Sequence, residues 1–302
     1  MSAPTLTQDT HTTTQAAATP QTGDAAPRSR TVPATGLSLA KRGALNGGRV
    51  LWRAGAILLF LLLWELGPLY LAPDSTRVFL PPLHEVLAAL GTLIAKGQLQ
   101  NHLSASLTRS VSGFGIAVVS AVVLGLLVAW YRALDRFLNP LLEVFRNTAA
   151  LALLPVFTLL LGIGETSKIS IVAYAAFFPV LLNTIAGVRT VDPLLIRAAR
   201  SLGLSNFTLF QKVILPSAVP TIFTGIRMAG TSSILVLIAA EMVGAKAGLG
   251  YLIVNSQSSF LIPDMYAGIL TVSLLGLAVN YLLVGVERHF SRWRTAVGSG
   301  NG

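Results

Sequence analysis

Cysteine is absent from the 302-residue chain, and charged residues make up only 11% of it. Without cysteine the chain has no disulfide, no cysteine-ligated zinc and no cysteine nucleophile. The shortage of charge, combined with 53% hydrophobic residues, excludes an ordinary soluble domain. Histidine is also scarce, and the four present, His11, His84, His102 and His289, lack the spacing of metal ligands.

A phosphate-binding loop of the Walker A type is missing as well. The nearest approach runs from Gly162 to Lys168, and it has Ser167 where the loop requires a glycine before the lysine. We therefore expect no catalytic residue, no metal and no directly bound cofactor, and the chain is not predicted to be an enzyme.

Long apolar runs are what the sequence does contain. A membrane-spanning helix needs about 20 predominantly apolar residues. Six stretches satisfy this need, at about 54–71, 111–131, 148–164, 169–188, 222–243 and 266–286. They predict an all-α integral membrane protein with six transmembrane helices over 51–290, the third kinked at Pro155. Residues 1–50, rich in Thr, Ala, Gln and Pro, are expected to form a disordered tail, and 291–302 a short one.

The formal charge of +10 describes the topology of the chain rather than an affinity for nucleic acid. With both termini in the cytoplasm, most of the 22 Lys and Arg residues fall on the cytoplasmic side. Those left outside are Arg77, Lys96, Arg109, Lys168 and Lys246. We expect a multi-pass chain with both termini in the cytoplasm and no nucleic-acid partner.

The predicted outer loop, about 72–109, contains a helical pattern. After Pro81 and Pro82, the residues Leu83, Val86, Leu87 and Leu90 recur at helical spacing. An interfacial or lid-like amphipathic helix is expected there.

The cytoplasmic loop over 189–221 has the most informative local signals. Asp192 can cap a helix whose first turn contains Pro193, and Gly203 can end it. Leu194, Leu195, Ala198, Ala199 and Leu202 would form its apolar side. A second short helix is expected from Phe207 to Val213, with a break at Leu215-Pro216. Two short helices with an apolar side would fit a groove in a partner protein. An interfacial helix lying on anionic lipid is the open alternative.

This loop resembles the EAA motif of ABC importer permeases. The matching positions are Arg197-Ala198-Ala199, then Gly203, then Val213-Ile214-Leu215-Pro216. Arg197 stands where the motif has glutamate, and Val213 where it has isoleucine. The nitrate/sulfonate/taurine branch is the most similar, through segments such as Ser106-Leu107-Thr108-Arg109, Ser167-Lys168-Ile169, Phe177-Phe178-Pro179, Ala240-Glu241 and Gly248-Leu249-Gly250. Relatives commonly have proline at Ala149, so a straighter start of the third span is expected.

The resemblance implies a type I ABC importer permease with the MetI-like fold, in a bacterial inner (plasma) membrane. Its partners would be two ABC ATPase subunits, which bind ATP and Mg²⁺, a periplasmic or lipid-anchored substrate-binding protein, and a second permease in a homodimer, with a heteromeric pair as the open alternative. The coupling helix, about 194–202, would dock into the ATPase. The substrate would be a small anion such as a sulfonate, taurine or nitrate.

Polar residues inside the spans are candidates for the translocation path. We expect the path to be lined by Asn183, Thr184, Thr231, Ser232 and Ser233. Glu241 is a candidate outer gate, with a structural hydrogen bond or salt bridge as the alternative. Glu143 and Arg146 are spaced to pair on one helix. Two ladders of small residues predict helix packing, the second with path lining as an alternative: Gly113, Ala117, Ala121 and Gly125, and Thr221, Gly225, Ala229 and Ser233.

Two other classes of membrane protein were weighed against an importer. A gradient-driven carrier should have coupling acids near the middle of the membrane and broken repeats, and neither is evident. A channel or scaffold would leave the cytoplasmic loop unexplained.

Overall fold

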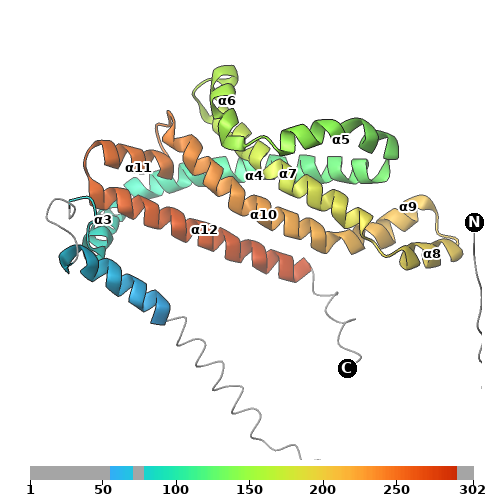
Figure 1. The fold of residues 1–302 in the computed structure, drawn as a ribbon, viewed down its shortest axis with the longest axis horizontal. Coiled ribbons are helices and arrows are strands. Elements are labelled where there is room, and N and C mark those ends of the chain that lie inside the picture. Colours follow the sequence, from blue (N-terminus) through green and yellow to red (C-terminus); the bar gives the residue numbers. More distant parts are fainter. Residues whose placement is uncertain (1–54, 71–77, 291–302) are drawn as a thin grey trace, which may run out of the picture. The chain divides into compact units, whose positions relative to one another are not determined.

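The computed structural model describes residues 55–70 and 78–290, and every regular element in those ranges is a helix. The chain divides into two units, Met1–Ala56 and Ile57–Gly302, and all contacts given below lie within the second. The predicted tails, 1–50 and 291–302, lie outside the described residues. In chain order the elements are the helix Gly55–Tyr70, α3 (Leu83–Ala95), α4 (Gln98–Trp130), α5 (Arg132–Arg146), η1 (Ala150–Leu153), α6 (Leu154–Leu161), α7 (Glu165–Arg189), α8 (Pro193–Ser201), α9 (Asn206–Leu209), η2 (Phe210–Ile214), α10 (Leu215–Met242), α11 (Leu249–Ser258) and α12 (Ile262–Phe290) (Figure 1).

Four of these helices are long and apolar enough to cross a membrane. They are α4, α7, α12 and a continuous run, Asn206–Met242, that joins α9, η2 and α10. A fifth candidate is a bent pair, α5 with Ala150–Leu161, whose halves meet at 87°. The all-α prediction is confirmed, and the described residues provide four or five candidate spans rather than six.

The predicted span 54–71 corresponds to the helix Gly55–Tyr70, which occupies all the described residues of that stretch, and its crossing of the membrane stays a prediction. One other predicted span differs from the helices found. In the stretch 148–164, a turn of 3₁₀ helix (η1) precedes α6, and Pro155 occupies the first turn of α6 instead of kinking a longer helix. Proline is tolerated there because first-turn amides have no partner within the helix. The expected straight start is wrong, because Ala149 has extended backbone (φ −64°, ψ 122°) at the bend.

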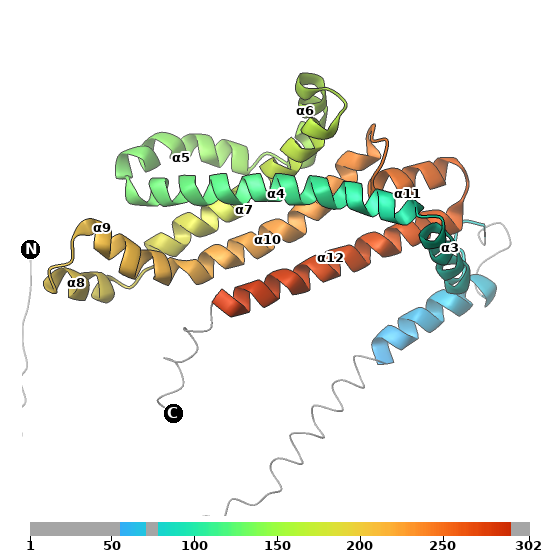
Figure 2. The same cartoon turned by 180° about the vertical axis from the view of Figure 1, so that it is seen from behind.

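The centre of the molecule is a layer of three helices in which α7 packs against both α4 and α10 (Figures 1 and 2). The predicted ladder Gly113, Ala117, Ala121 and Gly125 is buried along α4. A Cβ on Gly125 would come within 2.8 Å of Thr184 on α7, so the helices are closer than a larger side chain allows. The ladder is confirmed as a packing face.

The second predicted ladder also packs against α7. Gly225, Ala229 and Ser233 are buried on α10, and the nearest neighbours of Gly225 are Asn183 and the Pro179 carbonyl. Of the two readings of this ladder, the structure favours helix packing.

A second cluster joins α3, α11 and α12. It includes Val86 and Leu93 of α3, Leu249 and Leu252 of α11, and Ala267 of α12. The predicted helix after Pro82 is therefore confirmed as α3, although Leu87 on its predicted apolar side is 49% exposed. We call this region the α11 end of the molecule.

Candidate functional sites

The helix predicted from Asp192 and Pro193 is present as α8. The Asp192 carboxylate accepts a hydrogen bond from the Leu194 amide at 2.8 Å, and Pro193 occupies the first turn. Gly203 follows with φ +75°, a left-handed conformation that glycine adopts without steric cost. Local sequence signals therefore set both limits of this helix.

The two faces of α8 differ in what they contact. Ala199 is buried in a small cluster with Val191, Leu209 and Ile214, which anchors α8 to α9 and η2. Other apolar side chains of the loop point outward: Leu194 is 65% exposed, Leu195 50%, Leu202 80% and Phe207 74%. We call these four residues the α8 knob. The predicted single apolar side is thus divided, with Ala199 facing inward and the leucines outward.

The other positions of the EAA motif differ in burial. Arg197 and Ala198 are exposed, and the Arg197 side chain has no ion-pair partner within residues 55–70 and 78–290. Val213 packs against the cluster from its edge. Leu215 and Pro216 begin α10.

The break predicted at Leu215-Pro216 is wrong. The chain continues as one helix over Asn206–Met242, and Pro216 lies in the first turn of α10, directly after the π-helical turn η2. Proline cannot donate the amide hydrogen that an α-helix needs, and a wider π turn accommodates such an irregularity. Ser217 Oγ also donates to the Val213 carbonyl at 2.7 Å.

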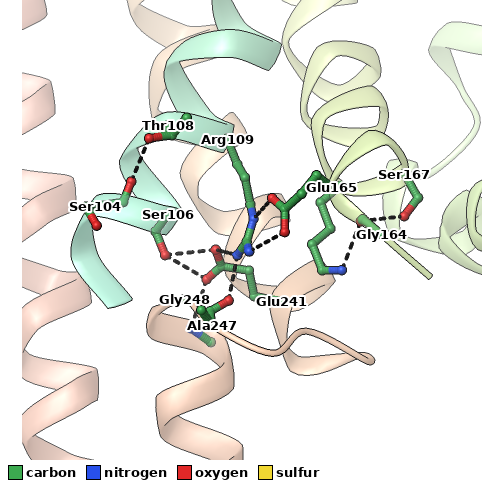
Figure 3. A network of polar contacts seen from close by, with 12 residues as sticks. Ser104, Ser106, Thr108, Arg109, Gly164, Glu165, Ser167, Glu241, Ala247 and Gly248 are labelled. Atoms are coloured by element: carbon green, nitrogen blue, oxygen red, sulfur yellow. Dashed lines mark hydrogen bonds and ion pairs between the residues drawn. The ribbon is translucent and has the colours of Figure 1, made fainter. Parts of the chain in front are cut away.

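A network of ionised groups lies at the α11 end, buried except for Glu165, whose side chain is 65% exposed (Figure 3). Arg109 of α4, with a side chain only 4% exposed, donates from Nη1 to Glu241 Oε1 of α10 at 2.7 Å. The same Nη1 donates to the Ala247 carbonyl at 2.7 Å. Its Nε and Nη2 donate to the two oxygens of Glu165, at the start of α7, at 2.5 and 2.7 Å. One guanidinium therefore ties together α4, α7 and α10.

Glu241 is fully enclosed within this network, with a side-chain exposure of 0%. Its carboxylate accepts a bond from Ser106 Oγ at 2.8 Å and from the Gly250 amide at 3.0 Å, in the first turn of α11. A carboxylate at a helix N-terminus is stabilised by free amides and by the helix dipole. A Cβ on Gly248, which has φ +125°, would collide with this carboxylate. The Gly248-Leu249-Gly250 segment therefore fits around Glu241.

The network is balanced in charge. Lys168 of α7 is buried beside it and donates from Nζ to the Gly164 carbonyl at 3.1 Å. Two cations, Arg109 and Lys168, thus face two carboxylates, Glu165 and Glu241. Buried charges are tolerated only when paired and hydrogen-bonded. The geometry of Glu241 matches the structural alternative, and its role as an outer gate stays a prediction.

The residues predicted to line the path fall into two groups. Thr184 and Ser233 are buried and donate to carbonyls of their own helices, Val180 at 2.8 Å and Gly230 at 2.9 Å. Asn183 likewise donates to the Pro179 carbonyl at 2.8 Å and packs against Gly225.

Thr231 and Ser232, in contrast, line an open groove of about 510 Å³ between α7, α10 and α12. We call it the Arg227 groove. It is also lined by Pro179, Thr224, Arg227, Met228, Leu235 and Asn280. Arg227 Nη1 contacts Glu287 Oε2 of α12 at 3.2 Å, and Thr224 Oγ1 donates to Glu287 Oε1 at 3.3 Å. The structure therefore places two of the five predicted path residues beside an ion pair.

The sequence reasoning missed Arg109, Glu165 and Lys168 as a unit and gave Arg227 no partner. Arg109 and Lys168 lay in segments that carried the family resemblance. The carboxylate partners of Arg109 are 56 and 132 residues away, so spacing gave no signal for them. The local pair Glu143–Arg146 is confirmed at 3.2 Å, with both side chains about half exposed. Across residues 55–70 and 78–290, no three or more His, Asp or Glu side chains gather as a metal-ligand set.

Residues 121–295 match the model of the family described as "Binding-protein-dependent transport system inner membrane component". The taurine transport system permease protein TauC of Escherichia coli K12 is 36% identical over 226 residues, covering 73% of this chain and 82% of TauC.

The bicarbonate transport system permease protein CmpB of Synechococcus elongatus is 32% identical over 263 residues, covering 83% of this chain and 92% of CmpB. Among solved structures, a chain of the inward-facing MetNI methionine ABC transporter matches with a TM-score of 0.51 at 17% identity, covering 72% of this chain and 99% of that chain. The match to the MetNI structure shows a similar fold and nothing further. By the family match and by these two relatives, the chain belongs to the binding-protein-dependent transport system inner membrane component family, whose members are permeases of ABC transporters.

Proposed function

We propose that this permease moves a small anion across the membrane in an ATP-driven ABC importer. The observation that carries this proposal is the α8 knob. These exposed apolar side chains lie on and directly after a capped helix, at the position of the EAA motif, in a chain of the permease family. The relatives named for taurine and bicarbonate transport support an anionic substrate for this chain.

The proposed assembly has a second permease, two ATPase subunits beneath the pair and a substrate-binding protein outside. ATP and Mg²⁺ bind to the ATPase, and this chain contributes no catalytic residue. The proposed topology has six spans, formed by the helix Gly55–Tyr70, the bent pair of α5 with Ala150–Leu161, and the four long helices. Both termini lie in the cytoplasm, because this orientation places most Lys and Arg residues there.

The connection from α8 to the rest of the molecule supports a mechanical role for this helix. Ala199 packs on Leu209 and Ile214, which belong to the continuous helix Asn206–Met242. That helix packs along α7, and α7 packs along α4. A displacement of α8 by a closing ATPase would therefore tilt α10 and the helices packed against it, which is how α8 would couple hydrolysis to transport.

The test is co-purification of the ATPase with the full-length chain from its native membranes in a mild detergent. Leu202 is 80% exposed, so Leu202→Asp places a charge on the knob without opening the core. We expect it to reduce ATPase retention by about tenfold or more, because changing one of the few central residues that dominate an interface costs about 2 kcal/mol or more. Gln211→Asp is the matched control, because Gln211 is exposed outside the knob.

Retention of the ATPase by the control and its loss from Leu202→Asp would support docking through α8. Equal retention by all three proteins would contradict it. Absence of any ATPase from the wild-type preparation, even after crosslinking in membranes, would contradict the importer itself.

A further inference from the structure

The depth of Arg227 in the membrane can be placed from two landmarks on α4. Arg109 belongs to the ionic network at the α11 end, and Trp130 ends the helix. The segment between them is about 32 Å long at 1.5 Å per residue, close to the ~30 Å of a hydrocarbon layer, and tryptophan is enriched at such boundaries. Arg227 lies at most about 21 Å from Glu241 along α10. It is therefore inside the hydrocarbon layer.

The ion pair at this depth is not sealed. The side chain of Arg227 is 46% exposed and that of Glu287 is 22% exposed. Ionised groups facing lipid at such depth are expensive, so they almost always face a protein interior or a water-filled cavity. Thr231, Ser232 and Asn280 add further polar groups to the same groove. Met228 and Leu235 also line the groove, so polar and apolar side chains are mixed there, and the exposed ion pair is the feature that requires water or a protein partner.

The Arg227–Glu287 pair differs from the Arg109 network in how easily it can separate. Arg109 makes ionic contacts of 2.5 to 2.7 Å with two carboxylates and is 4% exposed. Arg227 makes one ionic contact, at 3.2 Å. The first arrangement suits a permanent tie between helices, and the second suits a guanidinium that exchanges one carboxylate for another anion.

We infer that the Arg227 groove is a wall of the translocation path and that Arg227 is a transit site for the anionic group of the substrate, with Glu287 as its resident counter-ion. A passing sulfonate, carboxylate or similar anion contacts the guanidinium while Glu287 turns aside. When the anion leaves, Glu287 pairs with Arg227 again, so the cation never holds its cargo tightly. Asn280, whose side chain has no partner within the described ranges, is a further donor on the groove. The inference rests on the proposed function as an anion importer.

The absence of cysteine from the chain makes this inference testable in the full-length protein in native membranes. Single cysteines at Thr231 and Ser232 report on the groove, and Val119→Cys is the control. Val119 lies on α4 between the two landmarks and is 67% exposed, away from the groove. The probes are two water-soluble methanethiosulfonates, one bearing a sulfonate and one a trimethylammonium group.

We expect both groove cysteines to react with the probes and Val119→Cys to stay unmodified. We also expect the sulfonate probe to be favoured, because a fixed charge in a cleft concentrates counter-ions by about tenfold or more. Arg227→Gln should therefore lower the ratio of sulfonate to trimethylammonium labelling rates by about tenfold. Arg227→Lys should preserve most of the ratio, and Glu287→Gln should raise it. The amount of each variant in the membrane fraction is measured in parallel.

Unreactive groove cysteines, or a labelling ratio unaffected by Arg227→Gln in protein that reaches the membrane, would overturn the inference. This result is distinct from a failure of the proposed function, which is decided by ATPase co-purification. If the ATPase co-purifies but the groove cysteines do not react, the proposed function stands and only this inference is overturned. If the groove cysteines react with a preference for the anionic probe but no ATPase co-purifies, the anion path stands and the ABC mechanism is overturned.

Discussion

Arg109 is the residue on which the α11 end of the molecule depends. It balances two carboxylates from different helices, and one of them, Glu241, has no exposure to solvent. Removing the guanidinium would leave Glu241 hydrogen-bonded only to neutral donors, Ser106 Oγ and the Gly250 amide, with Lys168 nearby but forming no ion pair with it. The desolvation cost of that carboxylate would then be only partly compensated.

Arg109→Gln is therefore expected to destabilise the folded chain by about 3 to 5 kcal/mol, the range seen when one partner of a buried ion pair is removed. The measurement is thermal unfolding of the purified chain in detergent. Arg146→Gln is the control, since the Glu143–Arg146 pair is about half exposed, and it should cost less than about 1 kcal/mol. Similar losses for both variants would contradict the assignment of Arg109 as the central tie.

At the scale of elements, close contact between α4 and α7 depends on small residues. Gly125 faces Thr184 and the Leu181 carbonyl, whereas Gly115, on the same helix, has no atom within 4 Å of a built Cβ. A larger side chain would separate the helices at the first position and only cover outer surface at the second. Gly125 and Gly115 therefore serve as a test position and its control on the same helix.

Gly125→Leu should destabilise the chain by about 1 to 3 kcal/mol or more, as overpacking of a tight contact does, and Gly115→Leu should be close to neutral. Proteolysis of membrane vesicles, with the fraction of full-length chain as the readout, measures both. An unchanged Gly125→Leu protein would show that α4 and α7 are not in contact in the membrane.

The sequence predicted those elements whose signals are local. Asp192, Pro193 and Gly203 set the limits of α8, and the four-residue spacing of Gly113 to Gly125 predicted a packing face. Leu215-Pro216 was misread as a break because proline usually ends a helix, and the π turn that accommodates it has no signature in sequence. The ion-pair partners of Arg109 and Arg227 could not be predicted from the sequence, because ion pairs between helices distant in the chain depend on the tertiary arrangement. The five path residues stay a prediction. Helical spacing alone did not separate the packed face of α10, which contains Ser233, from its groove face, which contains Thr231 and Ser232.

At the scale of the whole molecule, we propose distinct roles for three regions. The α8 knob at one end of Asn206–Met242 would receive the motion of the ATPase, and the Arg109 network at the other end holds the helices together. The Arg227 groove lies between them along α10. This order predicts that transport depends on ATP through α8 and not on an ion gradient.

The central claim is tested most directly by uptake into proteoliposomes containing the complete complex, with the binding protein outside and ATP supplied to the ATPase side. Radiolabelled taurine, nitrate and bicarbonate are the substrates to compare. We predict uptake of at least one anion that requires both ATP and the binding protein and persists when ionophores abolish all ion gradients. Uptake that continues without ATP and stops with the ionophores would contradict the account and identify a gradient-driven carrier.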